Sequence, residues 1–291
     1  MDTSSTEIFP QIVIAVLLTA AIFFVYLVLE QLYRAYLSYG SAQVVVYPYT
    51  GSSTKTLTFQ QNPNNTANKT LPLSDNQLTG IEFSYSTFLY IADDTDDGVT
   101  NGWKCVFYKG YESGPFPLCG PGVFVSSNSA NQGAPTLRIV MNTYDTWYNT
   151  LDITQIPYNK WVHLAIVLRN NSLEAYVNGN LANKLSFNGT LPYQNYQPLV
   201  LFPNSKTNNT STGFDNSSGT APLKGIPAGD NFVLNGKFSG YISNLVYYSY
   251  AISYSEIQNA LAIGPSSEFD QGSMDQPPYL IDSWWTQRAG K

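Results

Sequence analysis

Apolar and polar residues alternate in the middle of the chain, from Trp161 to Phe187, in a pattern typical of β-strands. The apolar alternate positions are Val162, Leu164, Ile166 and Leu168 in one segment, and Leu173, Ala175 and Val177 in the next. A period of two with β-branched residues indicates strands rather than helices. Asn178-Gly179 follows, and this dipeptide tolerates the positive φ angles of a type I′ hairpin turn. The stretch therefore predicts a three-stranded antiparallel meander with one face in a core.

Shorter alternating segments lie on both sides of this meander. The expected strands are 43–49, 54–59, 80–91, 103–110, 122–126, 136–144, 146–153, 199–202 and 238–250. The polar stretches 60–75 and 203–230 are expected to be loops, since they have too few apolar residues to pack a core. Residues 253–261 are expected to form a short helix capped by Ser253, with Glu256 three positions later. Many short strands separated by turn signals indicate a two-sheet sandwich.

A different pattern precedes the strands, because residues 12–29 carry no charge and are almost all apolar. As a helix, this run would be about 27 Å long, close to the hydrocarbon thickness of a bilayer. The residues expected to face lipid include Ile12, Leu17, Phe23 and Leu29. A cleaved signal peptide or a buried core helix are the alternatives, but a signal peptide has a basic start and a shorter apolar run. We therefore expect a retained single-span membrane anchor.

Two signals disagree about the side of the membrane on which the C-terminal part lies. Arg34 follows the span, and the positive-inside rule then places the large domain on the cytosolic side. Seven Asn-X-Ser/Thr sequons favour the opposite side: Asn64, Asn68, Asn170, Asn188, Asn208, Asn209 and Asn216. Several of them would arise by chance in a chain rich in Asn, Ser and Thr. The two signals nearly balance, with the cytosolic side slightly favoured.

Composition narrows the classes of function. Charged residues make up 12% of the 291-residue chain and the net charge is −6, so we expect no nucleic-acid partner. Two cysteines exclude a disulfide-dense scaffold and a four-cysteine zinc site. Cys105 and Cys119 are expected either to form a disulfide, which would contribute about 3 kcal/mol by closing their loop, or to stay free in a reducing compartment.

The acidic residues suggest a metal site only weakly. The candidate ligands are Asp93, Asp94, Asp96 and Asp97, which precede Gly98 like the first half of a calcium loop. An EF-hand would have Glu at the twelfth position, where this chain has Lys104. We expect a solvated acidic loop here and no cofactor, with calcium as the alternative.

No catalytic set is evident in the sequence. Retaining glycoside hydrolysis needs two carboxyl groups about 5 Å apart, whereas Glu82 and Glu174 each stand alone in a strand pattern. His163 is the only histidine, and no nucleophile motif accompanies it. We interpret His163 as structural and expect no enzymatic activity.

Two stretches carry a resemblance to a known family. Trp161-Val-His-Leu-Ala-Ile-Val-Leu, followed by Glu174-Ala-Tyr-Val-Asn-Gly179, resembles the central signature of laminin-G-like, concanavalin A-like sandwiches. Gly240-Tyr-Ile-Ser-Asn-Leu-Val-Tyr-Tyr and the segment 251–257 resemble that family's closing strand and short helix. The resemblance implies an all-β fold, a two-sheet antiparallel concanavalin A-like jelly-roll sandwich, preceded here by one transmembrane α-helix. The expected parts are a tail (1–10), the helix and its juxtamembrane turn (11–38), the sandwich (41–263) and a C-terminal tail (264–291).

Three further segments, 103–110, 121–125 and 137–143, are similar to membrane-anchored laminin-G-like proteins of large DNA viruses. That similarity implies a minor capsid protein in the virion's internal membrane, whose sandwich faces the capsid and whose partners are the lipid bilayer and other capsid proteins. The alternative is a membrane-anchored lectin that binds glycans. Trp284 and Trp285 in the C-terminal tail are expected either to fold back on the sandwich or to dock on a neighbouring subunit.

Overall fold

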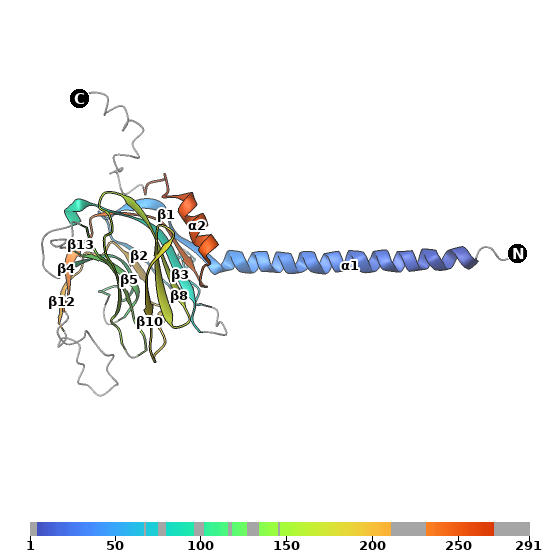
Figure 1. Cartoon of the computed structure of the whole chain (residues 1–291), viewed down its shortest axis with the longest axis horizontal. Helices are drawn as coiled ribbons and strands as arrows, with labels where there is room; N and C mark the ends of the chain where they lie inside the picture. Colours follow the sequence, from blue (N-terminus) through green and yellow to red (C-terminus); the bar gives the residue numbers. More distant parts are fainter. Residues whose placement is uncertain are drawn as a thin grey trace, which may run out of the picture. The chain divides into compact units, whose positions relative to one another are not determined.

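The chain forms two compact units, Met1–Gln43 and Val44–Lys291. The computed structural model describes residues 5–66, 68–74, 80–95, 102–115, 118–126, 134–144, 146–210 and 231–270. The first unit contains the helix α1, and the second contains strands β1–β14, the 3-10 helix η1 and the helix α2 (Figure 1).

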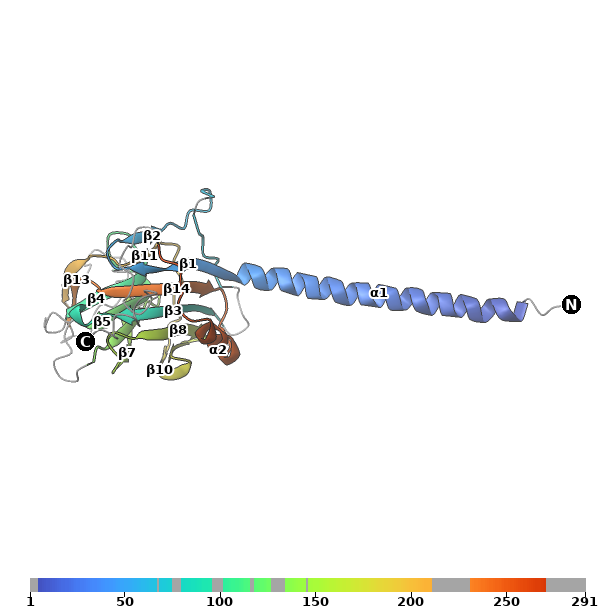
Figure 2. The ribbon, with the colours of Figure 1, turned by 90° about the horizontal axis from the view of Figure 1, so that it is seen from above.

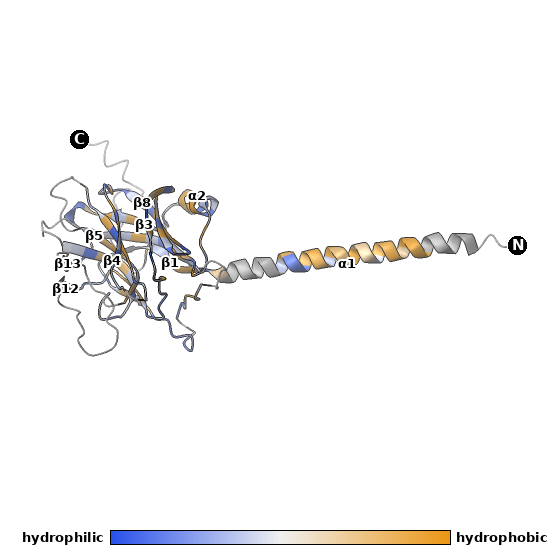
Figure 3. Cartoon of the chain, turned by 60° about the horizontal axis from the view of Figure 1, so that its bottom comes forward, coloured by the Kyte–Doolittle hydropathy of each residue, from blue (hydrophilic) through white to orange (hydrophobic). Residues whose placement is uncertain are grey.

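Helix α1 (Ser5–Ala42) confirms the expected N-terminal apolar helix. Its stretch Ile12–Tyr33 has a mean hydropathy of 3.0, and none of it is buried. Figure 3 shows most of this stretch as hydrophobic, with a short hydrophilic segment toward its C-terminal end, where the sequence has Glu30 and Gln31. At 1.5 Å per residue, its 22 residues are about 33 Å long. This length and composition fit a single-pass anchor, although a signal sequence would pass the same test.

The first sheet has six strands. In spatial order they are β1 (Gln43–Ser52), β14 (Gly240–Tyr248), β3 (Phe83–Ile91), β8 (Trp161–Arg169), β9 (Ser172–Val177) and β10 (Asn180–Ser186). Figure 2 shows β1, β14, β3 and β8 side by side. Strands β8, β9 and β10 pair antiparallel, which confirms the predicted meander. Its second turn has positive φ at Asn178 (48°) and Gly179 (80°), as a type I′ turn requires.

The second sheet has eight strands. Its main path is β12 (Lys206–Thr210), β13 (Asn231–Lys237), β4 (Gly102–Gly110), β5 (Cys119–Ser126), β6 (Leu137–Met141) and β7 (Asn149–Ile153); β11 (Leu199–Leu201) pairs with both β4 and β2 (Leu57–Phe59). Strand β4 pairs parallel with β13 over its first half and antiparallel with β11 over its second half. The pairs β4–β5, β5–β6 and β6–β7 are antiparallel.

The core lies between the two sheets and consists of alternate residues of facing strands. The predicted apolar face of β8 is confirmed, because Val162, Leu164, Ile166 and Leu168 are all at most 3% exposed and belong to this core. Burying an aliphatic side chain of this size contributes about 1.5–3 kcal/mol. The expected two-sheet, concanavalin A-like sandwich behind an apolar helix is confirmed.

Helix α2 (Tyr254–Ile263) covers part of the first sheet's other face. It begins as predicted: the Ser253 hydroxyl accepts a hydrogen bond from the backbone N–H of Glu256, and the Glu256 carboxylate accepts one from the N–H of Ser253. Ile257 packs with Ala165 and Val167 of β8 in a second apolar cluster.

The expected loop 203–230 is wrong at its start, because Lys206–Thr210 forms strand β12 and pairs antiparallel with β13. This strand has no apolar alternation, since it lies at the end of the sheet path and gains its order from backbone pairing with β13. The sequence did carry a signal for β13 itself: Phe232 and Leu234 alternate and are both nearly fully buried.

Candidate functional site

Glu174 of β9 is the carboxylate of the central meander, and it is fully engaged. It accepts hydrogen bonds from Lys184 Nζ at 2.8 Å and from the Tyr176 hydroxyl at 3.0 Å. Burial raises the pKa of the Glu174 carboxyl, but the bonds from Lys184 and Tyr176 outweigh burial and hold the pKa below its usual value. An ionised, paired carboxylate cannot serve as the proton donor that glycoside hydrolysis needs.

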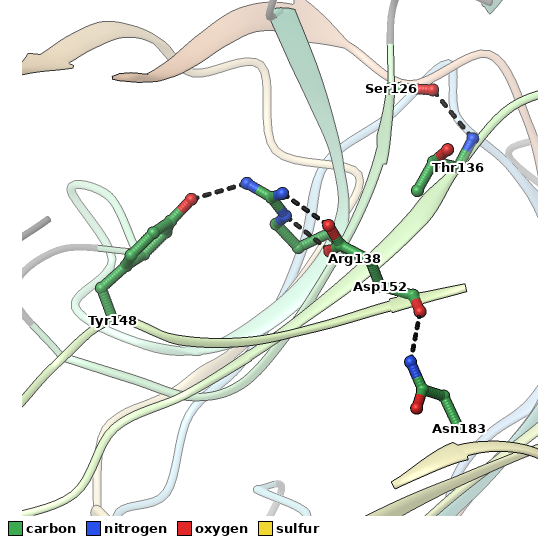
Figure 4. Close-up of polar contacts among 6 residues, drawn as sticks. All are labelled: Ser126, Thr136, Arg138, Tyr148, Asp152 and Asn183. Carbon is green, nitrogen blue, oxygen red and sulfur yellow. Dashed lines mark hydrogen bonds and ion pairs between the residues drawn. The ribbon is translucent and has the colours of Figure 1, made fainter. Parts of the chain in front are cut away.

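Arg138 of β6 makes several polar contacts in the second sheet (Figure 4). Its Nε and Nη2 atoms donate to the two carboxylate oxygens of Asp152 on β7, at 2.7 and 2.6 Å. Its Nη1 donates to the Tyr148 hydroxyl at 2.7 Å, and the guanidinium lies 4.2 Å from the centroid of the Trp103 ring. A bidentate pair with an aromatic cover is a strong structural contact. The arginine fork is therefore occupied and not open to an anionic ligand.

Asp152, the partner of Arg138, also links strand β7 of the second sheet to strand β10 of the first sheet. The backbone carbonyl of Asp152 accepts a hydrogen bond of 2.8 Å from Asn183 Nδ2 on β10, which belongs to the other sheet. Nearby, Ser126 Oγ accepts a bond of 2.9 Å from the Thr136 N–H and closes the β5–β6 connection (Figure 4). Asp152 thus supports the sandwich and is not free for catalysis.

His163 lies on β8, on the face of the first sheet opposite the core. Its Nε2 is 2.9 Å from Ser86 Oγ, and its ring centroid is 4.9 Å from that of Phe88. The residue is 1% exposed, and burial lowers its pKa to about 4. No carboxylate of the described residues contacts its Nδ1, so the charge relay of a catalytic triad is not formed there.

Cys105 and Cys119 are both buried free thiols. They belong to an aromatic-rich cluster of the second sheet that includes Trp103, Phe124 and Trp147. Burial raises the pKa of both thiols well above the usual value, so the reactive thiolate is scarce at neutral pH. The disulfide between them stays a prediction.

The acidic loop is described only in part. Asp93 and Asp94 lie in η1 (Asp93–Thr95) and are exposed, whereas Asp96 and Asp97 lie outside the described residues. Within the part of the chain that the structure describes, no three His, Cys, Asp or Glu residues are grouped as metal ligands. Calcium binding therefore stays a prediction. Trp284 and Trp285 also lie outside the described residues.

The residues predicted to face lipid are well exposed on α1. Ile12, Leu17, Phe23 and Leu29 are 55%, 63%, 61% and 59% exposed. A helix that is apolar on all sides has no polar face to turn toward water. The apolar side chains of this stretch are therefore exposed and do not pack into a core.

Three aromatic residues form a surface cluster that sequence reasoning missed. Tyr241 of β14, Tyr90 of β3 and Trp161 of β8 are direct neighbours across the first sheet. Their ring centroids are 5.7 Å (Tyr90–Trp161), 5.7 Å (Tyr90–Tyr241) and 6.5 Å (Trp161–Tyr241) apart, and all three are partly exposed. The pairing of β14 with β3 brings together residues that are far apart in the sequence, so alternation alone could not reveal this cluster.

These features define a two-sheet antiparallel sandwich preceded in the chain by an apolar helix. The sequence profile of the concanavalin A-like lectin/glucanases superfamily, in its laminin G form, matches residues 63–258. The chain therefore belongs to this superfamily. The family's description includes both lectins and glucanases, so membership supports a carbohydrate-binding or structural role without naming a ligand.

A comparison with solved structures found matches of low identity that each cover part of this chain. The receptor binding domain of botulinum neurotoxin D is 12% identical, with a TM-score of 0.44, over 76% of this chain and 43% of that chain. The binding domain of Paraclostridial Mosquitocidal Protein 1 is 14% identical, with a TM-score of 0.41, over 73% of this chain and 42% of that chain. The chain thus spans less than half the length of these structures. A search of the curated proteins gave no match.

Proposed function

We propose that this protein is a non-enzymatic, membrane-anchored attachment protein. In this proposal α1 spans the lipid bilayer and the sandwich binds other macromolecules. The observation that carries the proposal is the apolar surface of α1, none of which is buried between Ile12 and Tyr33. The chain continues from α1, which ends at Ala42, into β1 at Gln43 without a linker.

The described polar groups of the sandwich support binding rather than catalysis. The carboxylates of Glu174 and Asp152 are held by Lys184 and Arg138, and His163 is buried and neutral at physiological pH. Each of these groups is used within the fold.

The setting we propose is the virion of a large DNA virus, where the protein is a minor capsid protein that ties the shell to an internal membrane. The sandwich would face the capsid, and other capsid proteins would be its partners. The support comes from the resemblance of segments 103–110, 121–125 and 137–143, which fall on β4, β5 and β6, three consecutive neighbours in one sheet.

The anchor is tested by flotation of the full chain with lipid vesicles after alkaline carbonate extraction. We expect the wild-type protein to float, and the variant Leu17→Lys with Phe23→Lys to stay in the soluble fraction, because charges at the centre of a span are expensive. Leu181→Lys is the matched control, because Leu181 is 53% exposed on the sandwich. Release of the wild-type protein by carbonate would contradict the anchor. Failure to cosediment with capsid shells after the membrane is dissolved would contradict the capsid setting alone.

Glycan binding is the second candidate function, and the cluster of Tyr90, Trp161 and Tyr241 favours it. Partly exposed aromatic rings offer apolar faces and polar edges to a ligand. Glycan-array binding that Trp161→Ala abolishes would favour this function over the capsid setting, and loss of that binding with a chelator would add calcium to it.

A further inference from the structure

The segment Leu191–Pro198 has an inverted distribution of polar and apolar side chains. It reads Leu-Pro-Tyr-Gln-Asn-Tyr-Gln-Pro. Its amides Gln194 and Asn195 are only 8% and 1% exposed, whereas Leu191 and Tyr196 are 48% and 69% exposed. Large apolar side chains normally take the buried positions and amides the exposed ones. This segment does the reverse.

Buried hydrogen bonds hold Asn195 in this arrangement. Asn195 Nδ2 donates to the Lys109 carbonyl at 3.0 Å, and Asn195 Oδ1 accepts from the Gln197 N–H at 3.0 Å. Lys109 Nζ in turn donates to the Gln197 carbonyl at 2.6 Å. The backbone around Tyr196 is therefore fixed to the end of β4.

Gln194 fixes the other side of the segment. Its Nε2 donates to the Tyr247 hydroxyl at 2.7 Å, and its Oε1 accepts from the Ser74 N–H at 2.9 Å. With both amides satisfied, the exposed side chains are displayed from a rigid backbone, so ordering them on binding costs little conformational entropy.

Neighbouring loops extend the exposed apolar surface. The Tyr144 N–H donates to the Leu191 carbonyl at 3.2 Å, and the Tyr144 ring meets the Tyr193 ring edge-on, with centroids 5.1 Å apart. Tyr144 is 60% exposed, and Leu73, next to Ser74, is 37% exposed. We name the set Leu73, Tyr144, Leu191, Tyr193 and Tyr196 the tyrosine rim.

The chemistry of the rim is that of a protein interface. Tyrosine supplies a large rigid ring and a hydroxyl, and it is enriched among residues that dominate binding energy. The hydroxyls of Tyr144, Tyr193 and Tyr196 make no hydrogen bond within the described residues. They are free to pair with a partner.

We propose that the tyrosine rim is a contact between two copies of this chain, a proposal that rests on membrane attachment as proposed above. The chain is acidic, with a net charge of −6, but residues 186–205 carry no charge. Two acidic molecules repel each other least where uncharged residues form the contact, as Leu191, Tyr193 and Tyr196 do. The acidic residues nearest to the rim in the sequence, Asp75 and Asp145, lie outside the described residues. A two-fold contact must also complement itself, and hydroxyl groups do so because each both donates and accepts hydrogen bonds.

If both copies are anchored in one membrane, a contact of low affinity is enough to pair them. Copies held in one bilayer are confined to two dimensions, so their effective concentration far exceeds that in solution. A patch of a few tyrosines can then pair copies that would remain separate in dilute solution.

The test is disulfide cross-linking of the full chain in vesicles of phosphatidylcholine. Leu191→Cys places a thiol in the rim, and Leu181→Cys, on β10, is the control of matched exposure (48% and 53%). We expect at least about tenfold more cross-linked dimer from Leu191→Cys, which corresponds to about 1.4 kcal/mol of preference. Cys105 and Cys119 are buried and stay out of the reaction.

Second variants decide whether the tyrosines carry the contact. Adding Tyr144→Ser and Tyr196→Ser should abolish the cross-link, whereas Tyr254→Ser, at a position that is also 60% exposed but on α2, should leave it intact. Equal cross-linking at positions 191 and 181, or a cross-link that survives the double substitution, would overturn the proposal. Vesicle flotation of the same samples separates this result from a failure of the anchor.

Discussion

At the scale of single residues, the polar side chains that the sequence singled out in the strands are engaged within the fold. Arg138, Asp152 and Glu174 are paired, and His163 contacts Ser86 beside Phe88. Burial with a single neutral hydrogen bond keeps the imidazole uncharged. The imidazole of His163 is therefore part of the packing of the first sheet.

The sign of the His163 effect follows from its lowered pKa. The pKa of His163 is about 4 in the folded protein, against an ordinary value near 6.5. As the pH falls, His163 is therefore protonated in the unfolded chain before it is protonated in the folded one. Stability should therefore fall as pH drops from about 6.5 to about 4, by up to about 3 kcal/mol. His163→Gln should remove this part of the pH dependence, as measured by denaturant unfolding at several pH values.

A direct measurement is available because the chain has no other histidine. The imidazole proton resonance gives the pKa without further assignment. A value near 6.5 in the folded protein would contradict the burial of this side chain. Carboxylates titrate in the same window in both proteins, so only the difference between wild type and variant counts.

At the scale of elements, local pattern predicted those whose residues lie close together in the sequence. The β8–β10 meander followed from alternation and from Asn178-Gly179, α2 followed from Ser253 and Glu256, and α1 followed from an uncharged run. Strand β12 and the pairing of β4 with both β13 and β11 could not be predicted, because they depend on contacts between strands that are distant in the sequence. The aromatic cluster was missed for the same reason, whereas the tyrosine rim was missed because it depends on buried hydrogen bonds from Gln194 and Asn195 to distant segments.

Gly240, at the start of β14, is an element-scale test of that pairing. Its φ is +149°, and a Cβ there would lie 2.0 Å from the Tyr90 carbonyl oxygen. Gly240→Ala should separate β14 from β3 locally and destabilise the sandwich by more than about 2 kcal/mol. Gly114→Ala is the control, because a Cβ at Gly114 meets nothing within 4 Å. Equal unfolding midpoints for the two variants would refute the steric argument.

At the scale of the whole molecule, the two units carry different kinds of stability. The core of the sandwich, within the described residues, is composed of residues from Val44 onward. The helix, in contrast, exposes its apolar surface and has no core of its own. Lipid should therefore stabilise the first unit and have little effect on the second.

This division predicts the outcome of removing residues 1–42. The shortened chain should be soluble without detergent and should unfold with a midpoint within about 3 °C of that of the full chain in detergent, because a loss of 1 kcal/mol shifts Tm by only about 2–4 °C at this size. Calorimetry of both proteins in the same detergent measures the difference. A collapse of the midpoint on removal of the helix would show that the sandwich depends on α1.

The direct passage from Ala42 of α1 into Gln43 of β1 has a mechanical consequence. A flexible linker would extend before it transmitted a force. Because no linker separates α1 from β1, a force on α1 acts directly on the backbone of β1, an edge strand. The strand that receives it is hydrogen-bonded to β14, and a force along the strand would shear that ladder rather than peel it. In the anchoring role proposed above, a load between the membrane and a partner of the sandwich would therefore be shared by many backbone hydrogen bonds between β1 and β14.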